Sequence, residues 1–141
     1  MIHLTPFLLF DGNCVEAMRF YQSCLGGELT LTKASDTPMK DQIPPAQQDK
    51  IVHARLKSGA VEFTAADWMH PTRSPRPGNM VCVYLNGGTY PELKAAFDKL
   101  SAGADPALLD ELRDLPFGSY GHLADRFGVH WFFQGEKKQG A

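Results

Sequence analysis

The sequence predicts an α+β fold built from two tandem βαβββ modules. The main observation is that the same order of elements, strand–helix–strand–strand–strand, can be followed twice along the chain. A second observation is a shared spacing, since Phe20 and Phe97 are separated by as many residues as the helix-ending glycines Gly26 and Gly103. Residue identity between the halves is low, so the order of elements carries the prediction of a duplicated module.

The first module is expected over residues 1–69. Its strands are expected over 4–10 and 28–34, and as a hairpin over 51–57 and 61–67 around Ser58-Gly59. A helix should follow Asn13, which can cap it, with Glu16 completing a capping box and Gly26 ending it. Residues 35–49 hold three prolines and several polar residues and are expected to form a mobile loop.

A proline-rich linker is expected over residues 70–79, followed by the second module over 80–135 and a frayed tail over 136–141. In this module Thr89 caps the helix, Glu92 occupies the box position and Gly103 ends it. The strands are expected over 80–85 and 108–114, and as a hairpin over 120–125 and 129–134. We expect all 141 residues to form a single domain.

Composition excludes several classes of partner. The formal charge of −2 gives no basic surface for nucleic acid or an anionic membrane. No apolar run approaches the roughly 20 residues that span a bilayer. The N-terminus has no basic leader, and Cys14, Cys24 and Cys82 form neither an even set nor a CxxC pair. We therefore expect buried thiols in a cytoplasmic protein.

Three stretches together carry a family resemblance: FLLFDGNCVEAMRFYQSCLGGEL, IVHARLKSGAVEFTAAD and YGHLADRFGVHWFF. They resemble the PhnB-like (demethylubiquinone methyltransferase-like) branch of the vicinal oxygen chelate superfamily, which includes glyoxalase I, the bleomycin resistance proteins and the extradiol dioxygenases. The resemblance implies curved mixed sheets around a cleft, and commonly a homodimer. It also implies, in the enzymes, a divalent metal held by His, Glu or Gln from the first and fourth strand of each module.

The metal-ligand positions of the superfamily fall on unsuitable residues in this chain. They fall near Pro6, Thr64, Met80 and Phe132. Proline and phenylalanine have no donor atom, threonine is a poor ligand, and a lone thioether does not suit Zn, Ni, Mn or Fe(II) in this chemistry. We therefore expect no metal at the usual site and no cofactor.

Other residues could build a different catalytic site. Glu62 and Thr64 are two residues apart in one predicted strand, so their side chains should leave the same face of the sheet. If that face lines the cleft, Glu62 could act as a general base, with His53 as its candidate partner. The alternative is that Glu62 faces solvent and His53 is hydrogen-bonded to a neighbour. His122 and His130 lie near turns and are expected as surface or packing residues. The chain contains no GxSxG elbow, no P-loop and no dinucleotide-binding glycine pattern.

The expected cleft lining is largely apolar. Its residues are Leu8, Phe10, Glu62, Thr64, Met80, Cys82, Tyr84, His130 and Phe132. Such a lining suits a small, partly aromatic molecule, although the same residues could simply fill a core. Three functions stay open: a metal-independent small-molecule-binding protein, a glyoxalase-type lyase or isomerase using Glu62 and His53, and a structural or regulatory dimer without ligand. The first is favoured.

Overall fold

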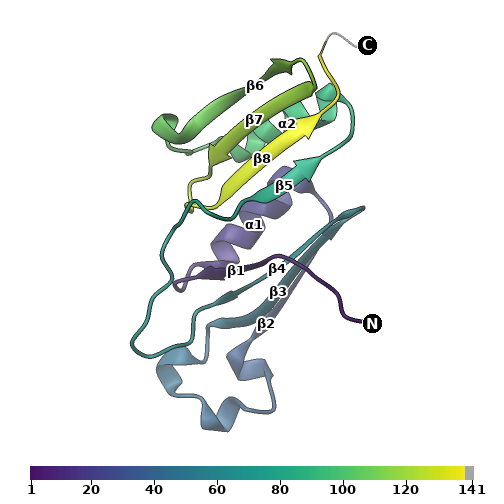
Figure 1. Cartoon of the computed structure of the whole chain (residues 1–141). Coiled ribbons are helices and arrows are strands. Elements are labelled where there is room, and N and C mark those ends of the chain that lie inside the picture. The colour runs from purple at the N-terminus through teal and green to yellow at the C-terminus, as the bar shows by residue number, and fades with distance from the viewer. Residues whose placement is uncertain (139–141) are drawn as a thin grey trace. The chain divides into compact units, whose positions relative to one another are not determined.

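The computed structural model describes residues 1–138 and contains two four-stranded sheets, each in its own compact unit (Figure 1). The first unit comprises Met1–Arg76 and the second Pro77–Ala141. The tail expected over 136–141 lies partly outside the described residues. Within residues 1–138, no helix combines the length and the apolar character needed to cross a membrane.

The first unit is a βαβββ module, as predicted. Its elements are β1 (Phe7–Phe10), α1 (Cys14–Leu25), β2 (Glu28–Lys33), β3 (Ile51–Ser58) and β4 (Val61–Asp67). The strand order is β1-β4-β3-β2, in which β1 runs parallel to β4 and the other pairs are antiparallel. The parallel pair requires a crossover, and α1 lies on the chain that provides it.

The second unit repeats this topology. Its elements are β5 (Val83–Asn86), α2 (Tyr90–Leu100), β6 (Leu109–Leu115), β7 (Gly118–Ala124) and β8 (His130–Gly135). The order is β5-β8-β7-β6, again with one parallel pair, β5 with β8. The tandem βαβββ prediction is therefore confirmed, although β5 begins at Val83 and not at Met80.

The segment between β2 and β3 is more ordered than the expected mobile loop. It contains three short 3-10 helices, η1 (Ala34–Asp36), η2 (Lys40–Gln42) and η3 (Pro45–Gln47). The side chain of Gln48, which follows η3, contacts η2 and its C-cap residue, because its Nε2 donates to the carbonyls of Lys40 at 2.6 Å and Ile43 at 2.7 Å. A fourth 3-10 helix, η4 (Pro106–Leu108), precedes β6.

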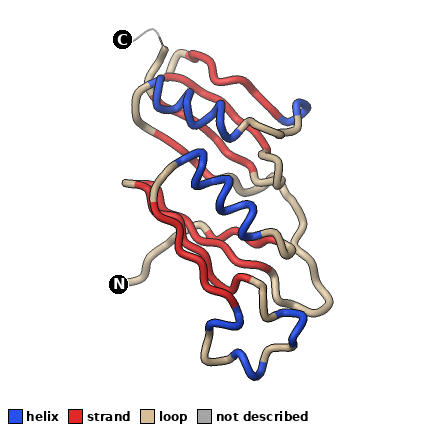
Figure 2. Tube along the Cα trace, turned by 180° about the vertical axis from the view of Figure 1, so that it is seen from behind, coloured by secondary structure: helices blue, strands red, loops and turns tan. Residues whose placement is uncertain are grey.

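Each helix packs on one face of its own sheet (Figure 2). In the first unit Tyr21 of α1 is fully buried and meets Phe63 of β4 edge-on, with ring centroids 5.7 Å apart. In the second unit Phe97 of α2 meets Phe133 of β8 at 5.0 Å. Among the described residues, the opposite face of each sheet carries no helix of its own unit, and we call it the open face.

The start of α1 corrects the capping prediction. Asn13 is the N-cap residue, but its side chain makes no capping hydrogen bond. Instead the buried carboxylate of Asp67 accepts from the backbone N–H of Cys14 at 2.9 Å, and its second oxygen accepts from Ile51 N–H at 2.9 Å. At α2 the predicted cap is present, since the Thr89 hydroxyl accepts from Glu92 N–H.

Candidate functional site

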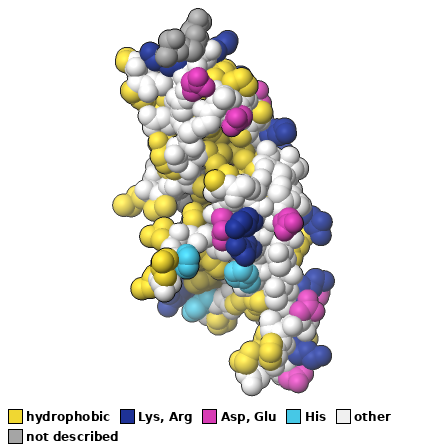
Figure 3. Space-filling model, turned by 90° about the vertical axis from the view of Figure 1, so that its right-hand side faces the viewer, with side chains coloured by type: hydrophobic (Ala, Val, Ile, Leu, Met, Phe, Trp, Pro, Cys, Tyr) yellow, Lys and Arg dark blue, Asp and Glu magenta, His cyan; other side chains and the backbone are white. Residues whose placement is uncertain are grey.

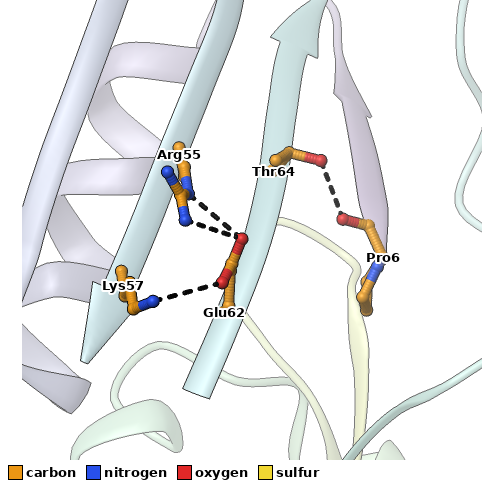
Figure 4. Close-up of polar contacts among 5 residues, drawn as sticks. All are labelled: Pro6, Arg55, Lys57, Glu62 and Thr64. Atoms are coloured by element: carbon orange, nitrogen blue, oxygen red, sulfur yellow. Dashed lines mark hydrogen bonds and ion pairs between the residues drawn. The ribbon is translucent and has the colours of Figure 1, made fainter. Parts of the chain in front are cut away.

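The open face of the first sheet is charged. Phe63 packs on α1, so its neighbours Glu62 and Thr64 point the other way. The Glu62 carboxylate lies 3.0 Å from Arg55 Nη2 and 3.8 Å from Lys57 Nζ (Figure 4). Figure 3 shows basic and acidic side chains beside one another, with hydrophobic side chains exposed among them. Glu62 is thus paired with two cations, one at each of its carboxylate oxygens.

His53 and Glu62 are not brought together. His53 lies exposed on β3. The pairing of Lys57 with Glu62 places His53 four residues further along the ladder, about 13 Å away by strand rise. That separation is too large for a shared metal ion or a direct proton relay, so the structure does not support a catalytic site built on this pair.

Leu8 and Phe10 do not lie on the open face, so the expected cleft lining was wrong at these two residues. Phe7 pairs with Thr64, so Phe7 and Leu9 share the open face, where they are 49% and 41% exposed. Phe10 is buried against Tyr21, on the helix-covered side, and strand alternation places Leu8 on that side too. The error was one residue of register, counted from Pro6, which lies outside β1.

The Thr64 hydroxyl is also occupied by a local contact. Its Oγ1 donates to the carbonyl of Pro6 at 2.9 Å, and the same carbonyl accepts the backbone N–H of Thr64 (Figure 4). Met80 is 95% exposed and precedes β5, and Phe132 offers only hydrocarbon. The residues at the superfamily's ligand positions therefore do not fit a divalent cation.

The open face of the second sheet is aromatic. Trp131 and Phe133 are buried on the side of α2, so Phe132 and its ladder partners Tyr84 and His122 face away from the helix. The ring centroid of Phe132 lies 4.6 Å from that of His122 and 5.7 Å from that of Tyr120. The Tyr84 hydroxyl lies 2.6 Å from Gln134 Oε1, to which it can donate. Five rings thus share this face: those of Tyr84, Tyr120, His122, His130 and Phe132.

Two histidines and a cysteine meet at one end of this face. His122 on β7 and His130 at the start of β8 are diagonal neighbours, and their Nε2 and Nδ1 atoms are 3.1 Å apart. The imidazole rings stack with centroids 5.2 Å apart. One ligand atom each from Cys82, His122 and His130 lies within 4.8 Å of the other two, and this is the sole such cluster among residues 1–138.

The surroundings favour an uncharged His122 ring. Burial lowers the pKa of His122, the neighbouring His130 lowers it further, and Asp110 opposes both effects. Asp110 Oδ2 is 4.0 Å from His122 Nδ1, so the lowered pKa makes this contact at neutral pH a dipolar one and not a full ion pair. Burial also raises the pKa of the Cys82 thiol.

The sequence predicts a surface or packing position for His122, and the structure places its ring against those of His130 and Phe132 on the open face. His122 and His130 flank the Arg126-Phe127-Gly128 turn, and the register of that hairpin makes them diagonal neighbours. The sequence held this signal, because two predicted strands around a short turn already place such residues on one face. Tyr120, two residues before His122, was missed for the same reason.

The topology and the open faces define the class. Tandem βαβββ modules with helices on one face of each sheet are the fold of the glyoxalase/bleomycin resistance/dioxygenase proteins. A family model described as 3-demethylubiquinone-9 3-methyltransferase matches residues 2–134. The chain belongs to this family, and the PhnB-like resemblance is confirmed.

Three relatives illustrate the similarity. Protein PA1353 from Pseudomonas aeruginosa is 31% identical, with a TM-score of 0.82 over 98% of this chain and 100% of that one. Protein YjdN from Escherichia coli (strain K12) is 27% identical over 96% of this chain and 97% of its own length. A putative 3-demethylubiquinone-9 3-methyltransferase, PhnB protein, from Bacillus cereus is 24% identical with a TM-score of 0.70, over 95% of this chain and 99% of that one.

Proposed function

We propose that this chain is a small-molecule-binding member of its family, which holds a partly apolar molecule on the open face of the second sheet. The observation that carries the proposal is the group of five rings on β5, β7 and β8, in which Phe132 lies between His122 and Tyr120. Aromatic faces of this kind bury a planar ligand at low entropic cost.

The polar groups on this face give the proposed ligand its chemistry. The hydroxyls of Tyr84 and Tyr120 and the imidazole nitrogens of His122 and His130 are hydrogen-bonding atoms beside the rings. A few convergent polar groups on an otherwise apolar surface are typical of small-molecule sites. The ligand class that fits is therefore an aromatic compound carrying one or two hydrogen-bonding substituents.

The two sheets differ in a way that favours the second. On the first, the exposed carboxylate and cations are already paired with one another, as Glu62 is with Arg55 and Lys57. An apolar ligand there would have to displace hydrated charges and would gain few ring contacts. We therefore place the binding surface on the second sheet and no cation at the superfamily's usual positions.

Methyl transfer is not proposed, in spite of the family's name. Binding a cofactor with adenine and methionine moieties normally uses a glycine-rich turn between a strand and a helix of an α/β sheet. Here the turn after β5 is Asn86-Gly87-Gly88, which lacks that spacing, and the turn after β1 is Asp11-Gly12-Asn13.

A homodimer is part of the proposal because superfamily members commonly complete their sites by dimerisation. Exposed apolar side chains such as Phe7 and Leu9 on the edge strand β1 support it, since burying them would be favourable. Light scattering tests the point: a mass of twice the 15.6 kDa chain supports the dimer, and a mass of one chain contradicts it.

A thermal-shift screen with aromatic compounds tests the binding proposal. Compounds that raise the midpoint of unfolding are then titrated into Phe132→Leu and into Phe117→Leu, which makes the same change at an exposed phenylalanine in the turn between β6 and β7. We expect Phe132→Leu to weaken binding about fivefold, since about 1 kcal/mol of ring contact is lost. Phe117→Leu should bind as the unaltered chain does. Equal effects of the two substitutions, or no stabilising compound in a broad screen, would contradict the proposal.

A further inference from the structure

Cys82, His122 and His130 form a cluster of potential metal ligands on the open face of the second sheet. Three side chains that can each coordinate a metal converge from three separate segments: the residues before β5, strand β7 and the start of β8. We propose that they form a Zn²⁺ site with three protein ligands and one open coordination position. This site goes beyond the proposed binding of an organic molecule and does not depend on it.

The donor set matches zinc in chemistry. Thiolate and imidazole are the ligands that zinc prefers, whereas calcium and magnesium require carboxylate or carbonyl oxygens. A Cys-His-His set with a free fourth position is the composition of a site that can exchange water for another ligand. The Cys82 thiol would release its proton to solvent when zinc binds.

The distances between donors also match. Zn–N bonds of about 2.0–2.1 Å in a tetrahedral arrangement place two nitrogen ligands about 3.3 Å apart. His122 Nε2 and His130 Nδ1 already lie 3.1 Å apart. With every ligand atom within 4.8 Å of the others, the Cys82 Sγ needs a movement of about 1 Å to reach its place, which a side-chain rotation can supply.

A second observation comes from Asp110 on β6. If His122 binds zinc through Nε2, its Nδ1–H points toward Asp110 Oδ2, which lies 4.0 Å away. A carboxylate behind a histidine ligand fixes the tautomer and the ring orientation at many zinc sites. The Asp110 side chain is 60% exposed and free to approach by the remaining distance. The carboxylate is therefore placed where a zinc-binding histidine would use it.

This site is distinct from the superfamily's ligand positions. Those positions fall at Met80 and Phe132, each two residues from a member of the cluster along its own chain segment. The proposed ion lies at the same open face, beside the ring of Phe132, which contacts His122 at 4.6 Å. The open coordination position can therefore accept a donor atom from a molecule resting on the aromatic face.

The test uses the full chain without a polyhistidine tag, freed of metal with a chelator and titrated with Zn²⁺ under equilibrium dialysis. We expect one ion per chain, with the affinity reduced about 100-fold or more by Cys82→Ser and by His122→Gln, because each removes one of three ligands. His53→Gln, an exposed histidine on β3, is the matched control and should leave the affinity unchanged.

Cobalt provides a spectroscopic check that does not rely on affinity. Co²⁺ in place of zinc should give a thiolate-to-metal charge-transfer band that disappears in Cys82→Ser, and far-UV circular dichroism establishes that each variant is folded. Absence of a stoichiometric ion, or equal affinity in all three variants, would overturn the site. Failure here leaves the organic-ligand proposal separately testable, because the thermal-shift screen can be run in the presence of chelator.

Discussion

At the scale of single residues, one buried carboxylate in each unit holds backbone segments in place. Asp67 and Asp125 are each 4% exposed. Asp67 accepts from two backbone N–H groups, those of Cys14 and Ile51, and so ties the start of α1 to the start of β3. Asp125 accepts from the backbone of the β7–β8 turn and from the Trp131 indole at 2.8 Å. The contacts of Asp67 join residues far apart in the chain, so local sequence does not reveal them and predicts Asn13 as the cap.

Replacing Asp67 by alanine should therefore lower the free energy of unfolding by about 3 kcal/mol, because two buried N–H donors lose their acceptor. Urea denaturation measures this change. Asp49→Ala removes an exposed carboxylate and should change stability by less than about 0.5 kcal/mol. A small effect of Asp67→Ala, similar to that of the control, would show that water or Asn13 replaces the cap.

The Cys14 thiol should make the free energy of unfolding depend on pH in the alkaline range. Burial raises the pKa of its thiol to about 12 from 9.0, and the charge of Asp67 adds to the effect. Because the folded-state pKa is the higher one, the contribution to stability is complete below pH 9 and is lost as the pH rises from 9 toward 12. Urea unfolding of the unaltered chain and of Cys14→Ala, repeated between pH 7 and about 10.5, measures this contribution to stability. The difference in stability between the two should shrink above pH 9, and a constant difference would show that ionisation of Cys14 does not limit stability there.

At the scale of elements, the junction between α1 and β2 depends on paired glycines. Gly26 and Gly27 both have positive φ, at 74° and 88°. A Cβ on Gly27 would lie 2.3 Å from the carbonyl oxygen of Lys57 and 2.7 Å from the Cα of Ser58, whereas a Cβ on Gly26 would meet only the Ser58 hydroxyl at 3.7 Å. The close packing of β2 on β3 thus requires glycine at the second position.

Gly27→Ala should destabilise the chain by about 3 kcal/mol or more, since it adds a backbone clash to the strain of positive φ. Gly26→Ala carries backbone strain at φ 74° and ψ −164° without the clash and should cost about 2 kcal/mol. Chemical denaturation of the two variants compares them directly. Equal costs would mean that β3 can move away from Gly27 without loss.

The order of elements could be predicted, whereas exact registers could not. Asn13, Gly26 and the two hairpin turns mark boundaries by local chemistry, and both βαβββ modules follow from them. The register of β1 against β4 is set by pairing between residues far apart in the chain, so an error of one residue turned Leu8 and Phe10 to the wrong side. The late start of β5 has the same origin, because its partner β8 lies far along the chain.

For the whole molecule, the duplicated topology carries two different open faces. The first is charged, with Glu62 held between Arg55 and Lys57, and the second is lined by rings. The family could be recognised from sequence because the three stretches that carry the resemblance form helices and strands of the two modules. The side chains of the proposed site were expected together only in part: Tyr84, His130 and Phe132 share one face of the second sheet, while His122 and Tyr120 join them through the register of β7 with β8.

Chemical-shift mapping tests directly whether the second sheet's open face binds a small partly apolar molecule. An ¹⁵N-labelled chain is titrated with a stabilising aromatic compound from the screen. We expect the perturbed amides to cluster on β5, β7 and β8, around Tyr84, His122 and Phe132, with β2 and β3 unchanged. Perturbations confined to the first sheet, around Arg55 and Glu62, would contradict it.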